Sequence, residues 1–329
     1  MIRNHLPRTT HHAPRTTMFT LPESLGRYKI MGINARNRDF IFPNNRRRFY
    51  PLVDDKLLTK RLAMEAGIQV PELYGVIEFI NQAGQVAKIA APHKEFVIKP
   101  CRGSGGEGIT VIRDVIGSSF LKANGELVSA GDMHYYITNI LGGMYSMSGT
   151  SDKAILEYMV QFDPIFNEIT YQGVPDIRII VYKGIPIMAM LRLPTRKSDG
   201  KANLHKGGIG AGIRMADGVT MYGVQGNRFV NEHPETLKPL AGRQIPRWPF
   251  LLEMASKFYD ITKLGYVGVD IVLDKEKGPM VLEANARPGI AIQIANRCGL
   301  LSRTERVDAV DVSTFNLRQR VDFAMNAYK

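Results

Sequence analysis

The spacing of apolar and polar positions predicts both helices and strands along this chain. The first strong helical pattern runs from Asp54 to Gly67, with an acidic residue at its start and a glycine placed to cap its end. Val70-Pro71 ends any helical continuation. We also predict an amphipathic helix over Phe250 to Lys263, a helix over Met133 to Leu141, and a final helix after Arg306.

Shorter apolar runs rich in β-branched residues predict strands. They cover residues 74–79, 96–99, 109–112, 154–160, 177–182 and 186–193, and less clearly 118–124. Residues 197–212 are rich in Gly and Lys and have no period, so we expect a loop there. Near the C-terminus, two strand-like runs flank the polar turn Asp274 to Pro279 and predict a β-hairpin within Gly268–Gly289.

The predicted hairpin brings three oxygen-bearing side chains together. With its centre between Glu276 and Lys277, Asp270 lies directly across from Glu283, and Asn285 projects from the same face as Glu283. Carboxylates held opposite one another repel, so this placement is explained if a cation lies between them. Two carboxylates and a carboxamide suit Mg²⁺ better than zinc. The competing interpretation is two solvated charges on an ordinary hairpin.

A glycine-rich segment between two predicted strands indicates a phosphate site. Lys99 ends the first strand, and the loop after it carries Gly103, Ser104, Gly105 and Gly106. Glycines let backbone N–H groups approach phosphate oxygens closely. A strand and not a helix follows, so the segment is neither a P-loop nor a dinucleotide fingerprint. It is either a flap that closes over a triphosphate or a plain glycine-rich turn.

An acidic residue is embedded in the buried strand predicted at residues 154–160. Glu157 is costly to bury there unless it is hydrogen-bonded. It either belongs to an adenine slot, in which main-chain groups of Tyr158, Met159 and Val160 contact the base edge, or it forms a salt bridge in the core.

The strand pair around Lys183-Gly184 carries three more charged residues. Asp176 and Arg178 share a strand face. A three-residue turn would bring Arg192 near Asp176, whereas a two-residue turn would place Arg192 on the opposite face. Arginine suits phosphate because its guanidinium is planar, always charged and able to bind bidentately. An ordinary cross-strand ion pair is the alternative.

Composition limits the class of protein without choosing its ligand. The 329 residues are 44% hydrophobic and 22% charged, which is typical of a folded protein. No apolar run approaches the roughly 20 residues needed to span a bilayer, and the basic N-terminus lacks a signal-peptide pattern. Two distant cysteines favour a reducing compartment, so we expect a cytoplasmic protein. The net charge of +12 favours anionic partners, although the aromatic-basic interleaving typical of nucleic-acid binding is missing.

The order of these motifs resembles that of the ATP-grasp superfamily, and within it the RimK-type α-L-glutamate ligases and α-L-glutamate ligase-like proteins. The resemblance covers roughly Asp54 to Asn296 and is most specific in Gly268–Gly289. It implies an α+β ATP-grasp fold with two lobes that clasp ATP: a smaller flap-bearing lobe at about 75–160 and a larger metal-bearing lobe at about 161–310. Both lie in a domain at 51–329, after a basic tail and arm at 1–50.

The resemblance also implies an ATP-dependent carboxylate–amine ligase that uses an acyl phosphate and acts on an acidic amino acid or peptide. A kinase and a non-catalytic nucleotide-binding module are the alternatives. The implied site has four parts: Lys56, Lys99, Gly103, Ser104, Gly105, Gly106 and Asp176 toward the nucleotide; Glu157, Tyr158, Met159 and Val160 around adenine; Asp270, Glu283 and Asn285 on Mg²⁺ or Mn²⁺; and Arg178, Arg192, Asn203 and Arg287 at the reacting groups and substrate.

One feature departs from the family pattern. Family members carry a full α/β domain before the ATP-grasp domain, and this domain helps to form the acceptor site. Here only about 50 residues precede the first predicted helix. We expect the segment Met31–Ile41 to take that place, as an arm that lines the cleft or mediates homo-oligomerisation.

Overall fold

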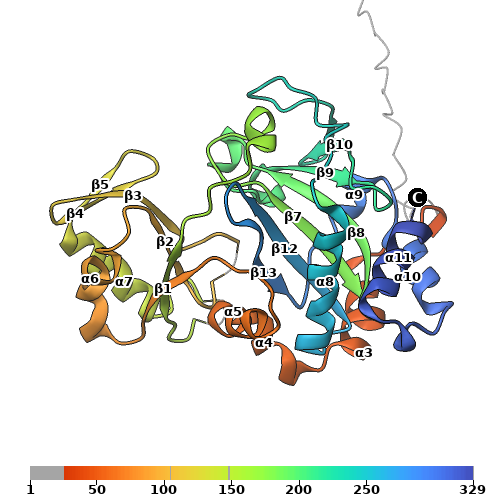
Figure 1. The fold of residues 1–329 in the computed structure, drawn as a ribbon, viewed down its shortest axis with the longest axis horizontal. Helices are drawn as coiled ribbons and strands as arrows, with labels where there is room; N and C mark the ends of the chain where they lie inside the picture. Colours follow the sequence, from red (N-terminus) through yellow and green to blue (C-terminus); the bar gives the residue numbers. More distant parts are fainter. Residues whose placement is uncertain (1–25, 104, 147–148, 329) are drawn as a thin grey trace, which may run out of the picture.

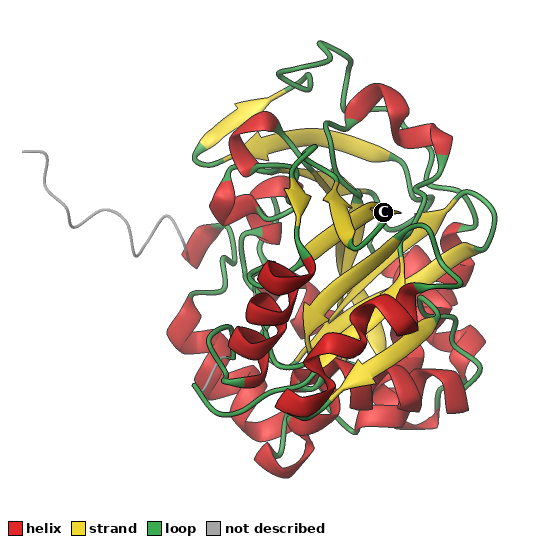
Figure 2. Cartoon of the chain, turned by 90° about the vertical axis from the view of Figure 1, so that its left-hand side faces the viewer, coloured by secondary structure: helices red, strands yellow, loops and turns green. Residues whose placement is uncertain are grey.

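Two antiparallel β-sheets and the helices packed against them form two lobes (Figure 1). The computed structural model describes residues 26–103, 105–146 and 149–328. The lobes have separate hydrophobic cores, and the core of the larger lobe includes Leu300, Val307 and Val321 of the C-terminal segment. Helices lie beside the strands of the sheets (Figure 2). No helix in these ranges is long and apolar enough to cross a membrane.

The smaller lobe is built on a six-stranded sheet with the order β1-β6-β2-β3-β4-β5. Its strands are β1 (Leu73–Ile77), β2 (Phe96–Pro100), β3 (Thr110–Ile116), β4 (Ser119–Lys122), β5 (Leu127–Val128) and β6 (Ala154–Tyr158). Helices α6 (Val86–Ala90) and α7 (Ala130–Leu141) complete its core. Because β6 pairs with both β1 and β2, its residues lie inside the sheet and are nearly all buried.

The larger lobe is built on a seven-stranded sheet with the order β11-β10-β9-β8-β7-β12-β13. Its strands are β7 (Asp176–Tyr182), β8 (Ile185–Leu193), β9 (Ile209–Ile213), β10 (Thr220–Gln225), β11 (Arg228–Val230), β12 (Tyr266–Asp274) and β13 (Gly278–Asn285). Four helices pack against it or each other: α8 (Trp248–Thr262), α9 (Ile292–Asn296), α10 (Leu300–Asp308) and α11 (Leu317–Ala327).

Helix α5 (Lys56–Glu65) lies between the two lobes (Figure 1). Its Leu57 packs with Cys101 and Ile155 of the smaller lobe, and the helix also contacts β13 of the larger one. The cap is Asp55, one residue later than the predicted start, because its side chain accepts hydrogen bonds from two backbone N–H groups of the first turn. Gly67 follows the helix with φ +67°, as a C-terminal cap requires.

The segment before α5 is an arm of short helical turns that packs on the larger lobe. It contains α2 (Ile33–Ala35), a π-helical turn at Arg36–Ile41, α3 (Phe42–Asn44) and α4 (Pro51–Asp54). The predicted basic tail at residues 1–17 lies outside the described residues.

The prediction of a loop over the whole of residues 197–212 was wrong at its end. Residues from Ile209 onward form β9, which is completely buried. Its glycines permit close packing and not flexibility: a Cβ at Gly212 would lie 2.4 Å from the carbonyl oxygen of Ala295 in α9.

Candidate functional site

The hairpin β12–β13 carries the predicted metal ligands at the predicted register. Asp270 pairs with Glu283, and Gly268 pairs with Asn285. The turn itself is centred on Glu276, because Asp274 pairs with Gly278. An extra residue, Leu282, is inserted before Glu283 as a β-bulge and restores the predicted pairing.

Two arginines on neighbouring strands surround Asp270. Arg178 binds it bidentately, with Nε–Oδ1 at 2.7 Å and Nη2–Oδ2 at 2.5 Å, and Arg192 donates to Oδ2 at 2.6 Å. Burial acts to raise the pKa of Asp270, but the two guanidiniums outweigh burial and lower this pKa to about 2. The carboxylate is therefore charged under all ordinary conditions.

Arg192 joins this cluster despite a two-residue turn. Tyr182 pairs with Ile185, so the turn is Lys183-Gly184, which by itself would place Arg192 on the opposite face. A β-bulge at Ile187 shifts the register, and Asp176 then pairs with Arg192. The expectation that a two-residue turn separates them was wrong for this reason.

Asp176 is held by Arg192 and lies near a second carboxylate. Arg192 Nε is 2.5 Å from Asp176 Oδ1. Burial raises the pKa of Asp176 to about 7; Arg192 opposes this shift and the charge of Asp270 adds to it. The two carboxylates therefore differ in proton affinity because Asp270 contacts two guanidiniums and Asp176 only one.

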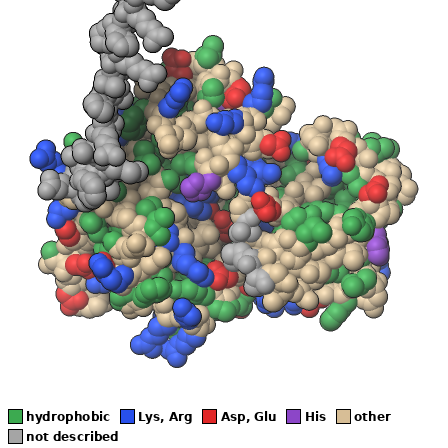
Figure 3. All heavy atoms as spheres, turned by 180° about the vertical axis from the view of Figure 1, so that it is seen from behind, with side chains coloured by type: hydrophobic (Ala, Val, Ile, Leu, Met, Phe, Trp, Pro, Cys, Tyr) green, Lys and Arg blue, Asp and Glu red, His purple; other side chains and the backbone are tan. Residues whose placement is uncertain are grey.

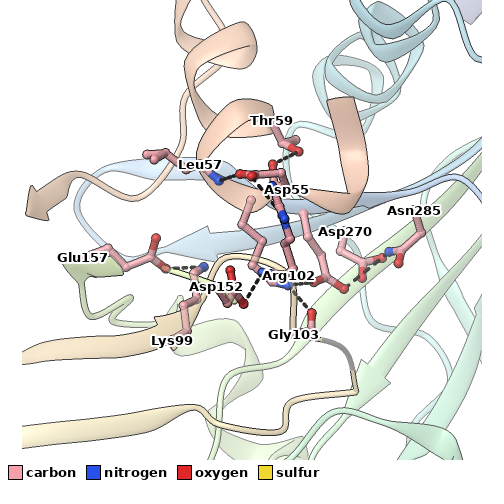
Figure 4. A network of polar contacts seen from close by, with 12 residues as sticks. Asp55, Leu57, Thr59, Lys99, Arg102, Gly103, Asp152, Glu157, Asp270 and Asn285 are labelled. Atoms are coloured by element: carbon pink, nitrogen blue, oxygen red, sulfur yellow. Dashed lines mark hydrogen bonds and ion pairs between the residues drawn. The ribbon is translucent and has the colours of Figure 1, made fainter. Parts of the chain in front are cut away.

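The open side of the cluster is formed by Glu283 and Asn285. The side chain of Glu283 is 35% exposed, its Oε1 lies 3.4 Å from Asn285 Nδ2, and its Oε2 lies 3.8 Å from Lys56 Nζ. Figure 4 shows Asp270 and Asn285 on one side of Gly103, with Lys99 and Glu157 on the other.

The oxygen atoms of Asp270, Glu283 and Asn285 match the ligand preference of Mg²⁺. Within the described ranges, no three or more His, Cys, Asp or Glu side chains form a metal-binding group. Mg²⁺ commonly uses only one or two protein carboxylates plus phosphate oxygens and water. Asp270 accepts three N–H bonds, which leaves one of its roughly four acceptor positions, while Glu283 is open to solvent.

Glu157 lies between two buried lysines, one of which the sequence analysis missed. Its carboxylate is 2.5 Å from Lys99 Nζ and 3.0 Å from Lys60 Nζ, and all three side chains are at most 8% exposed. Lys60 is four residues after Lys56 on α5, so helical spacing from the predicted phosphate contact was the available signal. The salt-bridge interpretation of Glu157 is confirmed; its part in an adenine slot stays a prediction.

The segment Tyr158–Val160, at the end of β6, links the two lobes. Met159 and Val160 are buried, and the Tyr158 hydroxyl donates to Asp274, the last residue of β12, at 2.9 Å. Lys277 Nζ lies 3.9 Å from the centre of the Tyr158 ring. The predicted adenine-contacting segment and the hairpin β12–β13 are therefore in direct contact.

The glycine-rich loop connects β2 and β3 and faces the larger lobe. Gly105 and Gly106 have φ of +63° and +74°, which favours glycine. Lys56 Nζ donates to the carbonyl oxygen of Gly103 at 2.5 Å, and a Cβ at Gly105 would lie 3.8 Å from Asn203 Nδ2. Ser104 lies outside the described residues.

Residues of both lobes line one small cavity, as a nucleotide site between the lobes requires. The lining residues are Lys56, Lys99, Pro100, Gly103, Gly105, Gly106, Glu107, Ile109 and Glu283. Basic and acidic side chains border the hollow between the lobes (Figure 3). Arg287 lies at the end of the hairpin, where its guanidinium is 5.1 Å from the ring centre of Tyr50.

The two lobes, the glycine loop and the hairpin cluster define an ATP-grasp enzyme. A family model described as sugar-transfer-associated ATP-grasp matches residues 35–309. The chain belongs to this sugar-transfer-associated ATP-grasp family. A comparison with curated proteins finds no match.

Several solved structures have a similar fold at low sequence identity. The ATP-grasp ligase PsnB, complexed with precursor peptide PsnA2 and AMPPNP, is 14% identical with a TM-score of 0.45, covering 85% of this chain and 62% of that one. The D-alanine–D-alanine ligase of Bacillus anthracis, complexed with ATP, is 12% identical with a TM-score of 0.38, covering 84% and 64%. The chain therefore spans less than two thirds of the length of either ligase. These likenesses are too distant to bear on its substrate.

Proposed function

We propose that this protein is an ATP-dependent carboxylate–amine ligase that forms an amide through an acyl phosphate. The observation that carries this proposal is that Glu283, which pairs with Asp270 and lies beside Asn285, lines the same cavity as Lys99 and the glycine loop. Phosphoryl transfer depends on positioning and charge neutralisation more than on a protein nucleophile.

Each group has a role that its surroundings support. Lys56 and Lys99 line the cavity and neutralise nucleotide phosphates, and the loop glycines offer backbone N–H groups. Asp270, Glu283 and Asn285 would hold Mg²⁺, and the ion would supply neutralisation of the nucleotide's phosphate charge.

Two arginines and a neighbouring carboxylate act at the transferred group. Arg178 and Arg192 are fixed by Asp270 and Asp176, so their guanidiniums are oriented before substrate binds. Asn203, next to the glycine loop, lies close to substrate. Asp176 orients Arg192 and, as predicted, faces the nucleotide.

We infer an acidic substrate, because the chain carries a net charge of +12 and resembles RimK-type glutamate ligases. The family description, which refers to sugar transfer, adds amino sugars and sugar acids to the substrates to be tested.

The test is an ATP-dependent screen with the full chain. Purified protein with Mg²⁺ and ATP is incubated with pools of amino acids, acidic peptides, amino sugars and sugar acids, and ADP and product masses are measured. We expect ADP only when a carboxylate and an amine are both present, together with an amide product. A stable phosphorylated product would instead identify a kinase, and no ADP and no nucleotide binding in any pool would refute the proposal.

A matched pair of variants on one hairpin separates the metal role from folding. Glu283→Gln should abolish Mg²⁺-dependent turnover with an unchanged circular dichroism spectrum, because a carboxylate ligand is lost. Glu276→Gln, an exposed position in the turn of the same hairpin, should behave as wild type. Near-normal turnover by Glu283→Gln would remove Glu283 from the metal site.

A further inference from the structure

One buried carboxylate attaches the segment that joins the two lobes to the turn of the hairpin β12–β13. Asp274 Oδ2 accepts hydrogen bonds from the Tyr158 hydroxyl and from Gln161 N, both at 2.9 Å. Its Oδ1 accepts from Glu276 N at 3.0 Å and from Lys277 N at 2.9 Å. The carboxylate therefore holds the joining segment with one oxygen and the hairpin turn with the other.

These four hydrogen bonds require Asp274 to be ionised. The residue is 2% exposed, and within the described ranges no ion pair includes it. Burial acts to raise its pKa, but hydrogen bonds from three backbone N–H groups and the Tyr158 hydroxyl lower this pKa below its ordinary value. The four bonds occupy the roughly four acceptor positions of an ionised carboxylate. Asp274 therefore has no acceptor left for a ligand and acts through the backbone that it holds.

The two donors to Asp274 Oδ2 bracket a pair of buried residues. Tyr158 precedes Met159 and Val160 in the chain, and Gln161 follows them. Met159 and Val160 are 5% and 8% exposed, and their backbone groups take no part in the hydrogen bonds of the described residues. Buried backbone groups are almost always paired. Adenine offers an N–H donor beside a ring-nitrogen acceptor, so its edge would pair these groups.

Backbone contacts with the hairpin support the same attachment. Asp163 N donates to the carbonyl oxygen of Leu273 at 2.8 Å, and Lys275 N donates to that of Gln161 at 2.7 Å. The joining segment follows β6, which belongs to the sheet of the smaller lobe. Its position is nevertheless set by the hairpin of the larger lobe.

We propose that Asp274 is a positioning residue that sets the backbone of Met159 and Val160 to recognise an adenine base. This rests on the proposed ATP-dependent function and deepens it, because it assigns the preference for adenine to a residue that does not touch the nucleotide. The phosphates would be held elsewhere, at the cavity lined by Lys56 and Lys99. Base recognition and phosphate binding should therefore respond separately to substitution.

The test compares a nucleotide with its phosphate chain alone. AMPPNP, GMPPNP and inorganic tripolyphosphate are titrated by calorimetry into the full chain with Mg²⁺. We expect wild type to bind AMPPNP more tightly than either of the others. Asp274→Asn places an amide NH₂ against hydrogen-bond donors. It should weaken AMPPNP binding about tenfold or more, reduce the preference over GMPPNP and leave the affinity for tripolyphosphate unchanged.

Two further variants separate this role from stability. Tyr158→Phe keeps the ring and removes one donor to Asp274, so it should weaken AMPPNP binding by about threefold. It decides the question if Asp274→Asn does not fold, and unchanged AMPPNP affinity would then overturn the inference. Asp311→Asn changes an exposed turn carboxylate that also accepts from a backbone N–H two residues later, and it should bind AMPPNP as wild type does.

The outcomes separate this inference from the ligase proposal. A lower melting temperature of Asp274→Asn with unchanged AMPPNP affinity would make Asp274 structural, and equal losses for AMPPNP and tripolyphosphate would place its effect at the phosphates; either result overturns the inference. Equal affinities of wild type for all three ligands would show that no base is recognised and would also overturn it. An Asp274-dependent preference for AMPPNP without amide formation in the ligase screen would retain the inference and contradict the ligase.

Discussion

The carboxylate of Glu157 neutralises two buried lysines, Lys60 and Lys99, so its replacement should be severely destabilising. Glu157→Gln leaves Lys60 and Lys99, which are 5% and 6% exposed, as two neighbouring buried cations without an anion. Breaking a buried ion pair from one side costs about 3–5 kcal/mol. Lys60→Met should cost less, about 1–3 kcal/mol, because the Lys99–Glu157 pair remains.

Urea unfolding can assign this loss to one lobe. The chain has a single tryptophan, Trp248, which is buried in the larger lobe, so its fluorescence reports that lobe, whereas far-ultraviolet circular dichroism reports both. With a slope of about 1.5 kcal/mol/M, Glu157→Gln should lower the midpoint of the smaller lobe's transition by about 2–3 M. The Trp248 transition should stay near its wild-type midpoint, because the lobes have separate cores.

Two outcomes would refute this reasoning. A loss below about 1 kcal/mol in Glu157→Gln would mean that the lysines are not held as buried cations by this carboxylate. An equal or larger loss in Lys60→Met would show that the net charge left in the core does not determine the cost.

Three more predictions follow from the same contacts. Burial acts to raise the pKa of Glu157, but Lys99 and Lys60 lower this pKa below its ordinary value of 4.5. The stability that Glu157 contributes is therefore present above pH 4.5 and is lost as pH falls through the folded-state pKa. In urea titrations below pH 4.5, wild type should lose stability with pH more steeply than Glu157→Gln, and an equal pH dependence of the two would contradict this. Lys99→Ala should weaken ATP binding, measured by calorimetry, more than it lowers the melting temperature; a fall in melting temperature alone would make Lys99 structural. Asp270→Asn leaves the buried guanidinium of Arg178 without its bidentate carboxylate, while Arg192 keeps Asp176, and should lower the stability reported by Trp248 by about 3–5 kcal/mol; an unchanged midpoint would show that Arg178 is solvated.

The sequence predicted the elements of the site better than their register. The pairing of Asp270 with Glu283 was correct, yet it depends on the bulge at Leu282, for which the sequence had no signal. The same kind of insertion at Ile187 brings Arg192 to Asp176 against the expectation from a two-residue turn. Bulges depend on tertiary packing, so local patterns do not locate them.

Residues outside the recognisable motifs were harder to predict. Lys60 lies at helical spacing from Lys56, and this spacing could have indicated that it belongs to the site. Its pairing with Glu157, however, depends on α5 packing against the smaller sheet. Arg36 has no such signal, because its hydrogen-bond partner Pro288 is distant in sequence and meets it only when the arm docks.

The most direct test of the ligase proposal follows the oxygen atoms of the substrate. Glutamate labelled with ¹⁸O in both carboxylates is incubated with the protein, Mg²⁺, ATP and the amine pool that supports ADP formation, and the released phosphate is analysed by mass spectrometry. An acyl phosphate requires one ¹⁸O to pass from the carboxylate to phosphate as the amide forms. Unlabelled phosphate, with all ¹⁸O retained in the glutamate carboxylates, would contradict carboxylate activation.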